Sequence, residues 1–123
     1  MKYSIKRDPN VDAIVVKASG MINTTIAEEM VIKTGIALNE SKLKRCFFDL
    51  SNTVVDPEQT MIEMVAFSKT FERAGISPSV RMAALYTSDE DPRLYLEDGM
   101  ALLGLTMKQF KDYQEAVKWL CAV

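Results

Sequence analysis

The feature that most constrains the fold is a nearly continuous apolar run in the middle of the chain, Arg45-Cys46-Phe47-Phe48-Asp49-Leu50. Successive side chains of a strand point to opposite faces of its sheet, so a strand with one face in water alternates apolar and polar residues. This run does not alternate, which is typical of a strand that is covered on both faces. We therefore expect a central strand here, in a sheet against which helices pack.

Strand and helix patterns precede this run. Residues 2–7 and residues 13–18 flank the turn-forming Asp8-Pro9-Asn10 and predict an opening β-hairpin. A helical pattern follows, in which Thr25 and Glu28 fit a capping box that satisfies two unpaired backbone amides. The first helix is therefore expected to begin near Thr25.

Three later helices have similar start signals. Asp56-Pro57 and Asp91-Pro92 each place a good N-cap residue before a proline, whose missing N–H would have been unpaired at the first helical position. Asp112 is expected to cap a brief terminal helix. The helix that begins at Asp56 should be the longest and should end at Gly75, which can adopt a left-handed conformation.

Two more strands are expected at residues 80–87 and, at a sheet edge, at residues 107–111. The predicted order is β-β-α-β-α-β-α-β-α in a single domain, residues 1–123. Strands that alternate with helices imply parallel pairing through right-handed crossovers. The predicted fold class is therefore α/β: a mixed, largely parallel sheet with an N-terminal β-hairpin and covering helices.

Composition excludes several classes of function. The formal net charge is −2, from 15 basic and 17 acidic side chains, so no overall positive field attracts nucleic acid. The chain has no histidine, which removes the usual general base and the commonest metal ligand. Because glycine-rich phosphate loops and Cys/His clusters are also missing from the sequence, we expect no enzymatic activity, no metal and no cofactor.

The expected setting is the cytoplasm. Cys46 and Cys121 do not form a disulfide framework, and a thiol in an apolar strand behaves as a small hydrophobe. No stretch approaches the ~18 apolar residues of a membrane span. Charged residues from Lys2 onward interrupt any signal-peptide pattern.

A candidate binding site follows the central strand. Ser51, Asn52, Thr53, Asp56 and Glu58 belong to a predicted loop that leaves the carboxyl end of this strand and meets a helix N-terminus. In open α/β sheets, ligands and partners dock at that edge. The alternative is that the first three residues are ordinary turn formers and that Asp56 only caps a helix.

At these residues the chain resembles the SpoIIAA-like branch of the STAS-like proteins, the group of sulfate-transporter and anti-sigma-factor-antagonist domains. The predicted element order, the segment FFDLSNTVVD and the ending MKQFKDYQEAVKWL carry the resemblance. In the ending, the residues that match the branch are Phe110, Asp112, Ala116, Trp119 and Leu120. The resemblance implies a bacterial regulatory protein.

The resemblance also implies a phosphorylation switch, from which this chain departs. In anti-sigma-factor antagonists an aspartate, matched here by Asp56, is followed directly by the serine that a partner kinase phosphorylates. Pro57 occupies that position and cannot accept a phosphate. Either Glu58 supplies a fixed negative charge at the helix N-terminus, or Ser51 or Thr53 is the acceptor.

The sequence therefore leaves two candidate functions. The first is a non-enzymatic interaction module that binds a protein partner, a second copy of the chain included, through residues 51–58 and the exposed side of the second helix. The second is a small-ligand or lipid carrier, because SpoIIAA-like proteins resemble lipid-transfer folds in architecture. Methionine and phenylalanine side chains of the second and third helices would then line an apolar pocket.

Overall fold

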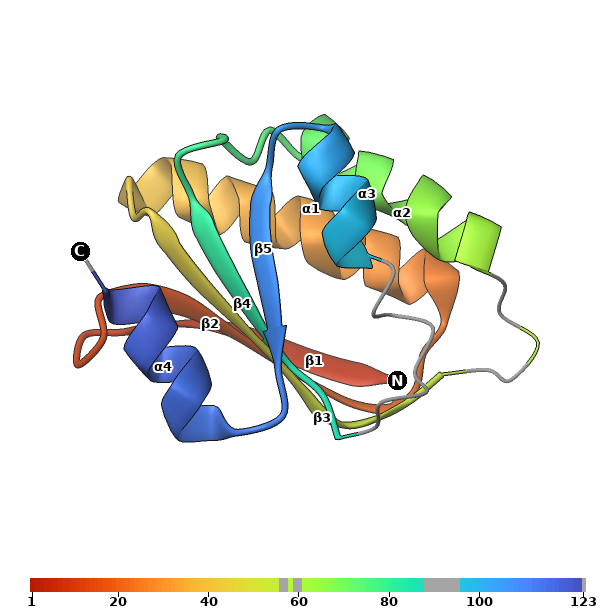
Figure 1. The fold of residues 1–123 in the computed structure, drawn as a ribbon, viewed down its shortest axis with the longest axis horizontal. Helices are drawn as coiled ribbons and strands as arrows, with labels where there is room; N and C mark the ends of the chain where they lie inside the picture. Colours follow the sequence, from red (N-terminus) through yellow and green to blue (C-terminus); the bar gives the residue numbers. More distant parts are fainter. Residues whose placement is uncertain (56–57, 59–60, 88–95, 123) are drawn as a thin grey trace.

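The computed structural model describes residues 1–55, 58, 61–87 and 96–122. Strands and helices alternate along the chain after an opening hairpin, which confirms the predicted order (Figure 1). The elements are β1 (Lys2–Asp8), β2 (Ala13–Met21), α1 (Thr24–Ser41), β3 (Arg45–Val54), α2 (Met61–Arg73), β4 (Arg81–Leu85), α3 (Leu96–Leu102), β5 (Thr106–Phe110) and α4 (Tyr113–Cys121).

The sheet has the order β1-β2-β3-β4-β5. β1 pairs with β2 in antiparallel orientation, and each later pair of neighbours is parallel. This confirms a mixed, largely parallel sheet with an N-terminal hairpin. β3 lies at its centre and β5 at one edge, as the sequence predicted.

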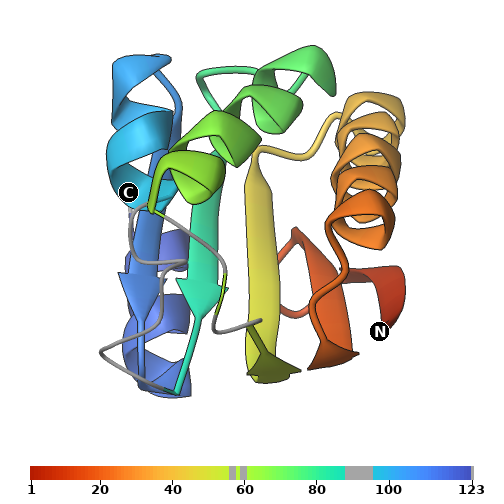
Figure 2. The ribbon, with the colours of Figure 1, turned by 90° about the vertical axis from the view of Figure 1, so that its right-hand side faces the viewer.

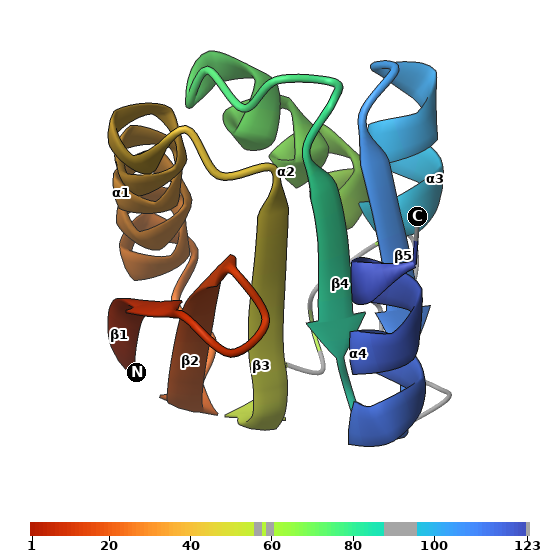
Figure 3. The ribbon, with the colours of Figure 1, turned by 90° about the vertical axis from the view of Figure 1, so that its left-hand side faces the viewer.

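Helices cover both faces of the sheet. α1, α2 and α3 lie on one face and α4 lies on the other, as Figures 1 and 3 show. Cys46 and Phe48 belong to the large core on the side of the three helices, whereas Phe47 packs with Ala116 and Leu120 of α4. The uninterrupted apolar run of β3 is therefore explained by burial on two sides.

Two predictions about the helices are wrong. Asn23, and not Thr25, caps α1: its side-chain oxygen accepts a hydrogen bond from the amide of Ile26. Among the described helices α1 is the longest, with 18 residues against 13 for α2. The expected helix starts at Asp56-Pro57 and Asp91-Pro92 lie outside the described residues.

The ends of α2 and α3 agree with the prediction from the sequence. Gly75 and Gly104 follow α2 and α3, and each has a φ of 75°. This is the left-handed region, which glycine enters without the steric cost that a Cβ would bring. The predicted stop at Gly75 is confirmed.

α1 and α2 come into close contact near their C-terminal ends. Gly35 is buried in α1, and a Cβ atom added there would lie 2.2 Å from the carbonyl oxygen of Ala74. One turn further along, the side-chain amide of Asn39 donates a hydrogen bond to the carbonyl of Gly75. Gly35 therefore allows the two segments to approach more closely than any other residue would.

We expect Gly35→Ala to destabilise the protein by about 1–3 kcal/mol, since the added methyl group has no room beside Ala74. In an exposed helix the same change would stabilise by about 1 kcal/mol, so the sign separates packing from helix propensity. Urea unfolding followed by circular dichroism measures the difference. Ile36→Ala, at an exposed neighbour, is the control, and a rise in the Gly35→Ala midpoint would contradict the interpretation.

α4 begins at the cap that the sequence predicted. One carboxylate oxygen of Asp112 accepts hydrogen bonds from the amides of Gln114, at 2.7 Å, and Glu115, at 3.3 Å. Asp112→Ala should therefore lower the free energy of unfolding by about 1 kcal/mol. Asp112→Asn should restore most of this loss, because the amide oxygen accepts the same bonds. Thermal unfolding of both variants tests the cap. Equal losses of stability in Asp112→Ala and Asp112→Asn would show that another property of Asp112 matters.

Candidate functional site

The carboxyl ends of β2 and β3 and the first turns of α1 and α2 lie on one side of the molecule, which Figure 2 views directly. We call this side the carboxyl edge. Parallel strands present their carboxyl ends together, and helix N-termini expose unpaired backbone amides beside them. The segment after β3, where the sequence predicted a site, begins at this edge.

The predicted loop at Ser51-Asn52-Thr53 is wrong, because β3 continues to Val54. After an irregularity between Lys17 and Ser19, the backbone of β3 pairs again with that of β2, so that Asn52 lies opposite Ser19 and Thr53 opposite Gly20. Pairing with a neighbouring strand supplies partners for the backbone groups. This outweighs the turn preference of the three side chains.

The two hydroxyl groups of this segment are used locally. Ser51 Oγ donates to a carboxylate oxygen of Asp49 at 2.6 Å, and Thr53 Oγ1 donates to the carbonyl of Leu50 at 2.6 Å. Thr53 is only 6% exposed. A kinase needs an accessible hydroxyl, so this burial argues against Thr53 as a phosphate acceptor. At Ser51 a phosphate would meet the Asp49 carboxylate.

Of the other three predicted site residues, the structure describes Asn52 and Glu58. Asn52 is exposed and lines a polar hollow with Lys17 and Asp49. Glu58 is exposed in a turn, and Asp56 lies outside the described residues. Ser51, Asn52 and Thr53 therefore follow one another along a strand, without converging on a common point.

An exposed apolar pair at the carboxyl edge was not predicted. Met21 and Val54 are the last residues of β2 and β3, lie opposite each other in the sheet, and are each 59% exposed. The sequence does carry a signal for this pair. Met21 resumes apolar character after Ser19-Gly20, and Val54 follows three polar residues.

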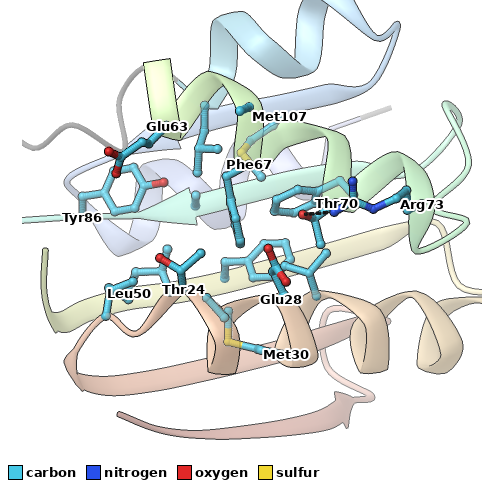
Figure 4. Close-up of a pocket in the computed structure, with 18 residues that line it drawn as sticks. Thr24, Glu28, Met30, Leu50, Glu63, Phe67, Thr70, Arg73, Tyr86 and Met107 are labelled. Atoms are coloured by element: carbon cyan, nitrogen blue, oxygen red, sulfur yellow. Dashed lines mark hydrogen bonds between the residues drawn. The ribbon is translucent and has the colours of Figure 1, made fainter. Parts of the chain in front are cut away.

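An apolar pocket of about 300 Å³ lies between α1 and α2, above β3 and β4 (Figure 4). It occupies the N-terminal side of the contact at Gly35, and small side chains leave room in it: Ala27, Ala66 and Ala84. The remaining lining residues are Ile22, Thr24, Glu28, Met30, Val31, Phe48, Leu50, Glu63, Phe67, Thr70, Phe71, Arg73, Tyr86, Leu96 and Met107.

The origin of the lining residues differs in part from the sequence prediction. Phe67 and Phe71 come from α2, as expected. Among the lining side chains that the structure describes, the methionines are Met30 of α1 and Met107 of β5, and Met100 of α3 is fully buried in the core. The pocket thus lies between helices and sheet, where the predicted apolar pocket would be.

Some polar groups of the pocket have protein partners. The guanidinium of Arg73 donates to the hydroxyl of Thr70 at 3.1 Å, and the side-chain amide of Gln109 donates to the hydroxyl of Tyr86 at 3.2 Å. In the described part of the chain, Glu28 has neither a hydrogen bond nor an ion pair. Glu28 as a whole is half-buried, and its side chain faces the pocket (Figure 4).

The described residues offer little for metal binding or thiol chemistry. Among them, no group of three or more histidine, cysteine, aspartate or glutamate side chains is placed to hold a metal ion. Burial raises the pKa of the Cys46 thiol far above its usual value, because the thiolate would lose its hydration. None of the described helices has the length and apolar character needed to cross a membrane.

Comparison with known proteins identifies the fold. No family model and no curated protein matches the sequence. An anti-sigma factor antagonist from Mycobacterium paratuberculosis is similar in structure, with a TM-score of 0.64 and 12% identity over 98% of this chain and 96% of that one. The anti-sigma factor antagonist SpoIIAA in its unphosphorylated form gives 0.54 and 10%, over 99% and 100%.

A third solved structure agrees with these two. It is an uncharacterized protein of the DUF3478 family, described as having a SpoIIAA-like fold, from Shewanella loihica PV-4. Its TM-score is 0.53 at 17% identity, over 98% of this chain and 93% of that one. All three likenesses extend over nearly the whole length of both chains. The chain therefore has a SpoIIAA-like fold.

Proposed function

We propose that this protein is a non-enzymatic regulatory module that binds a protein partner through the carboxyl edge. The observation that carries the proposal is the exposed pair Met21 and Val54. Burying a large apolar side chain gains roughly 1.5–3 kcal/mol, so a partner that covers both residues obtains a substantial part of its binding energy there. Two solved proteins of this fold are named as antagonists of an anti-sigma factor, which is itself a protein.

The surroundings of the pair fit an interface. Ile62, in the first turn of α2, is 77% exposed, and Glu58 and Asn23 add exposed polar groups from the segments next to the strand ends. An apolar centre with a polar rim is the usual composition of a protein-protein interface. Asp56 and Glu58 remain proposed members of this surface. The free thiols Cys46 and Cys121 support a reducing, cytoplasmic setting.

We expect the double variant Met21→Thr/Val54→Thr to lose the partner while it keeps the fold, because threonine suits a strand and removes apolar surface only at the exposed edge. Pull-down from the source cells with quantitative mass spectrometry compares its recovered proteins with those of the wild type. Enrichment of the partner should fall at least tenfold.

The matched control is Ile32→Gln/Ile36→Gln, which removes two exposed apolar side chains from α1. It should recover the same proteins as the wild type. If Met21→Thr/Val54→Thr, called the edge variant below, recovers the partner as well as the wild type does and has an unchanged circular dichroism spectrum, the proposal is contradicted. Sedimentation of the purified chain shows whether the partner is a second copy, since the edge variant would then be monomeric where the wild type is dimeric.

The apolar pocket favours a second candidate function, the binding of a small ligand. Pockets for small molecules have volumes of roughly 300–1,000 Å³ and are mostly apolar with a few polar groups. The pocket between α1 and α2 is at the lower end of this range and has this composition. It would hold a compact molecule, and a long lipid chain would extend beyond it.

Filling the pocket tests this candidate. Ala27→Leu on α1 and Ala66→Leu on α2 add bulk from opposite walls, and both substitutions keep good helix formers. Native mass spectrometry of the purified wild type should show a bound small molecule, and each variant should show the apo mass. The apo mass for wild-type protein that is purified under the same gentle conditions would count against a carrier function.

A further inference from the structure

Among the described residues of the pocket lining, one charged side chain has no partner. Glu28 is half-buried, its side chain faces the pocket, and within the described residues it forms no hydrogen bond or ion pair (Figure 4). A carboxylate that is partly removed from water gains most from a donor that carries positive charge. None of the described residues provides such a donor at Glu28.

Arg73 is the one cationic residue of the described pocket lining. Arg73 donates to Thr70, and these two residues lie together at one end of the pocket (Figure 4). Glu63 comes from the facing helix and adds a second carboxylate to the lining. The unpartnered carboxylate of Glu28 makes a carboxylate or phosphate a poor ligand at that position, because like charges repel.

The apolar part of the lining is rich in aromatic rings. Phe71 lies edge to face with Phe48, at 5.8 Å between ring centroids, and with Phe67, at 6.0 Å. All three rings line the pocket. A flat aromatic ligand would extend this arrangement, because ring edges are attracted to ring faces.

We propose that the pocket binds a small aromatic molecule with a cationic amino group, and that Glu28 accepts hydrogen bonds from this group while Phe48, Phe67 and Phe71 enclose the ring. The proposal rests on the ligand-binding function of the pocket and names the chemical class of the ligand. Glu28 thus acts as the residue that selects the amino group, and the small alanine side chains of the walls leave room for the ring.

Three naphthalene compounds of similar size test the proposal: 1-naphthylmethylamine, 1-naphthalenemethanol and 1-naphthoate. Isothermal titration with the full chain near pH 7 measures the affinity of each. The amine should bind at least tenfold more tightly than the alcohol, and the carboxylate should bind most weakly. Glu28→Gln should weaken amine binding roughly tenfold and leave alcohol binding unchanged, because only the charge-assisted hydrogen bond is lost.

Glu29→Gln is the matched control. It changes the net charge by the same amount one residue away, but Glu29 already accepts a hydrogen bond from the Tyr3 hydroxyl and lies 3.5 Å from the Lys33 ammonium. These two groups lower its pKa, and it is not part of the pocket lining. The preference for the amine should persist in this variant. An equal loss in both variants would show general attraction to a negative surface and would overturn the proposal.

The outcomes separate this inference from the function on which it rests. If none of the three compounds binds to the wild type, the inference fails, whereas the ligand-binding function fails only if the native mass spectrum of the wild type also shows the apo mass. If all three bind equally and Glu28→Gln has no effect, the pocket binds ligands but the role of Glu28 is wrong. Amine binding that survives in both Ala27→Leu and Ala66→Leu would place the amine outside the pocket and would also overturn the proposal.

Discussion

The close contact between α1 and α2 at Gly35 is the constraint on which the arrangement of these two helices over the sheet depends. Helices in proteins usually pack with their axes about 8–10 Å apart, according to the side chains at the contact. The missing side chain of Gly35 lets the backbone of Ala74 approach α1 directly. The contact fixes the two helices at one end, and the pocket lies toward their other ends, where Ala27 and Ala66 face it.

The exposed pair of the carboxyl edge, Met21 and Val54, does not belong to the pocket lining, although the first turns of α1 and α2 contribute to both surfaces. Met21 is exposed, whereas the next residue, Ile22, lines the pocket. The amide of Ile22 donates to the carbonyl of Val54, so the backbone at this junction is held in the sheet. Substitution of Met21 and Val54 therefore changes the outer surface without touching the pocket lining. The two proposed functions can be separated by mutation for this reason.

Much of the fold could be predicted from local signals. The unbroken apolar run at Cys46 to Phe48 indicated a central strand. Asp112 marked the start of α4 because its carboxylate can accept hydrogen bonds from backbone amides, and Gly75 marked the end of α2 because glycine can adopt a positive φ. Where two local signals competed, the prediction failed. Asn23 and Thr25 are both good N-caps, and the position at which β2 leaves the sheet determined which of them is used.

The sequence by itself determined the order of the elements, the strand that lies at the centre and the absence of histidine-based chemistry, because periodicity, capping and composition are properties of neighbouring residues. Only the tertiary structure decided that Ser51 to Thr53 extend a strand, that Gly35 is a packing residue and that Glu28 faces an apolar pocket. Each of these depends on a distance between segments that are far apart in the chain. Such distances are set by the packing of helices on the sheet, which no local pattern encodes.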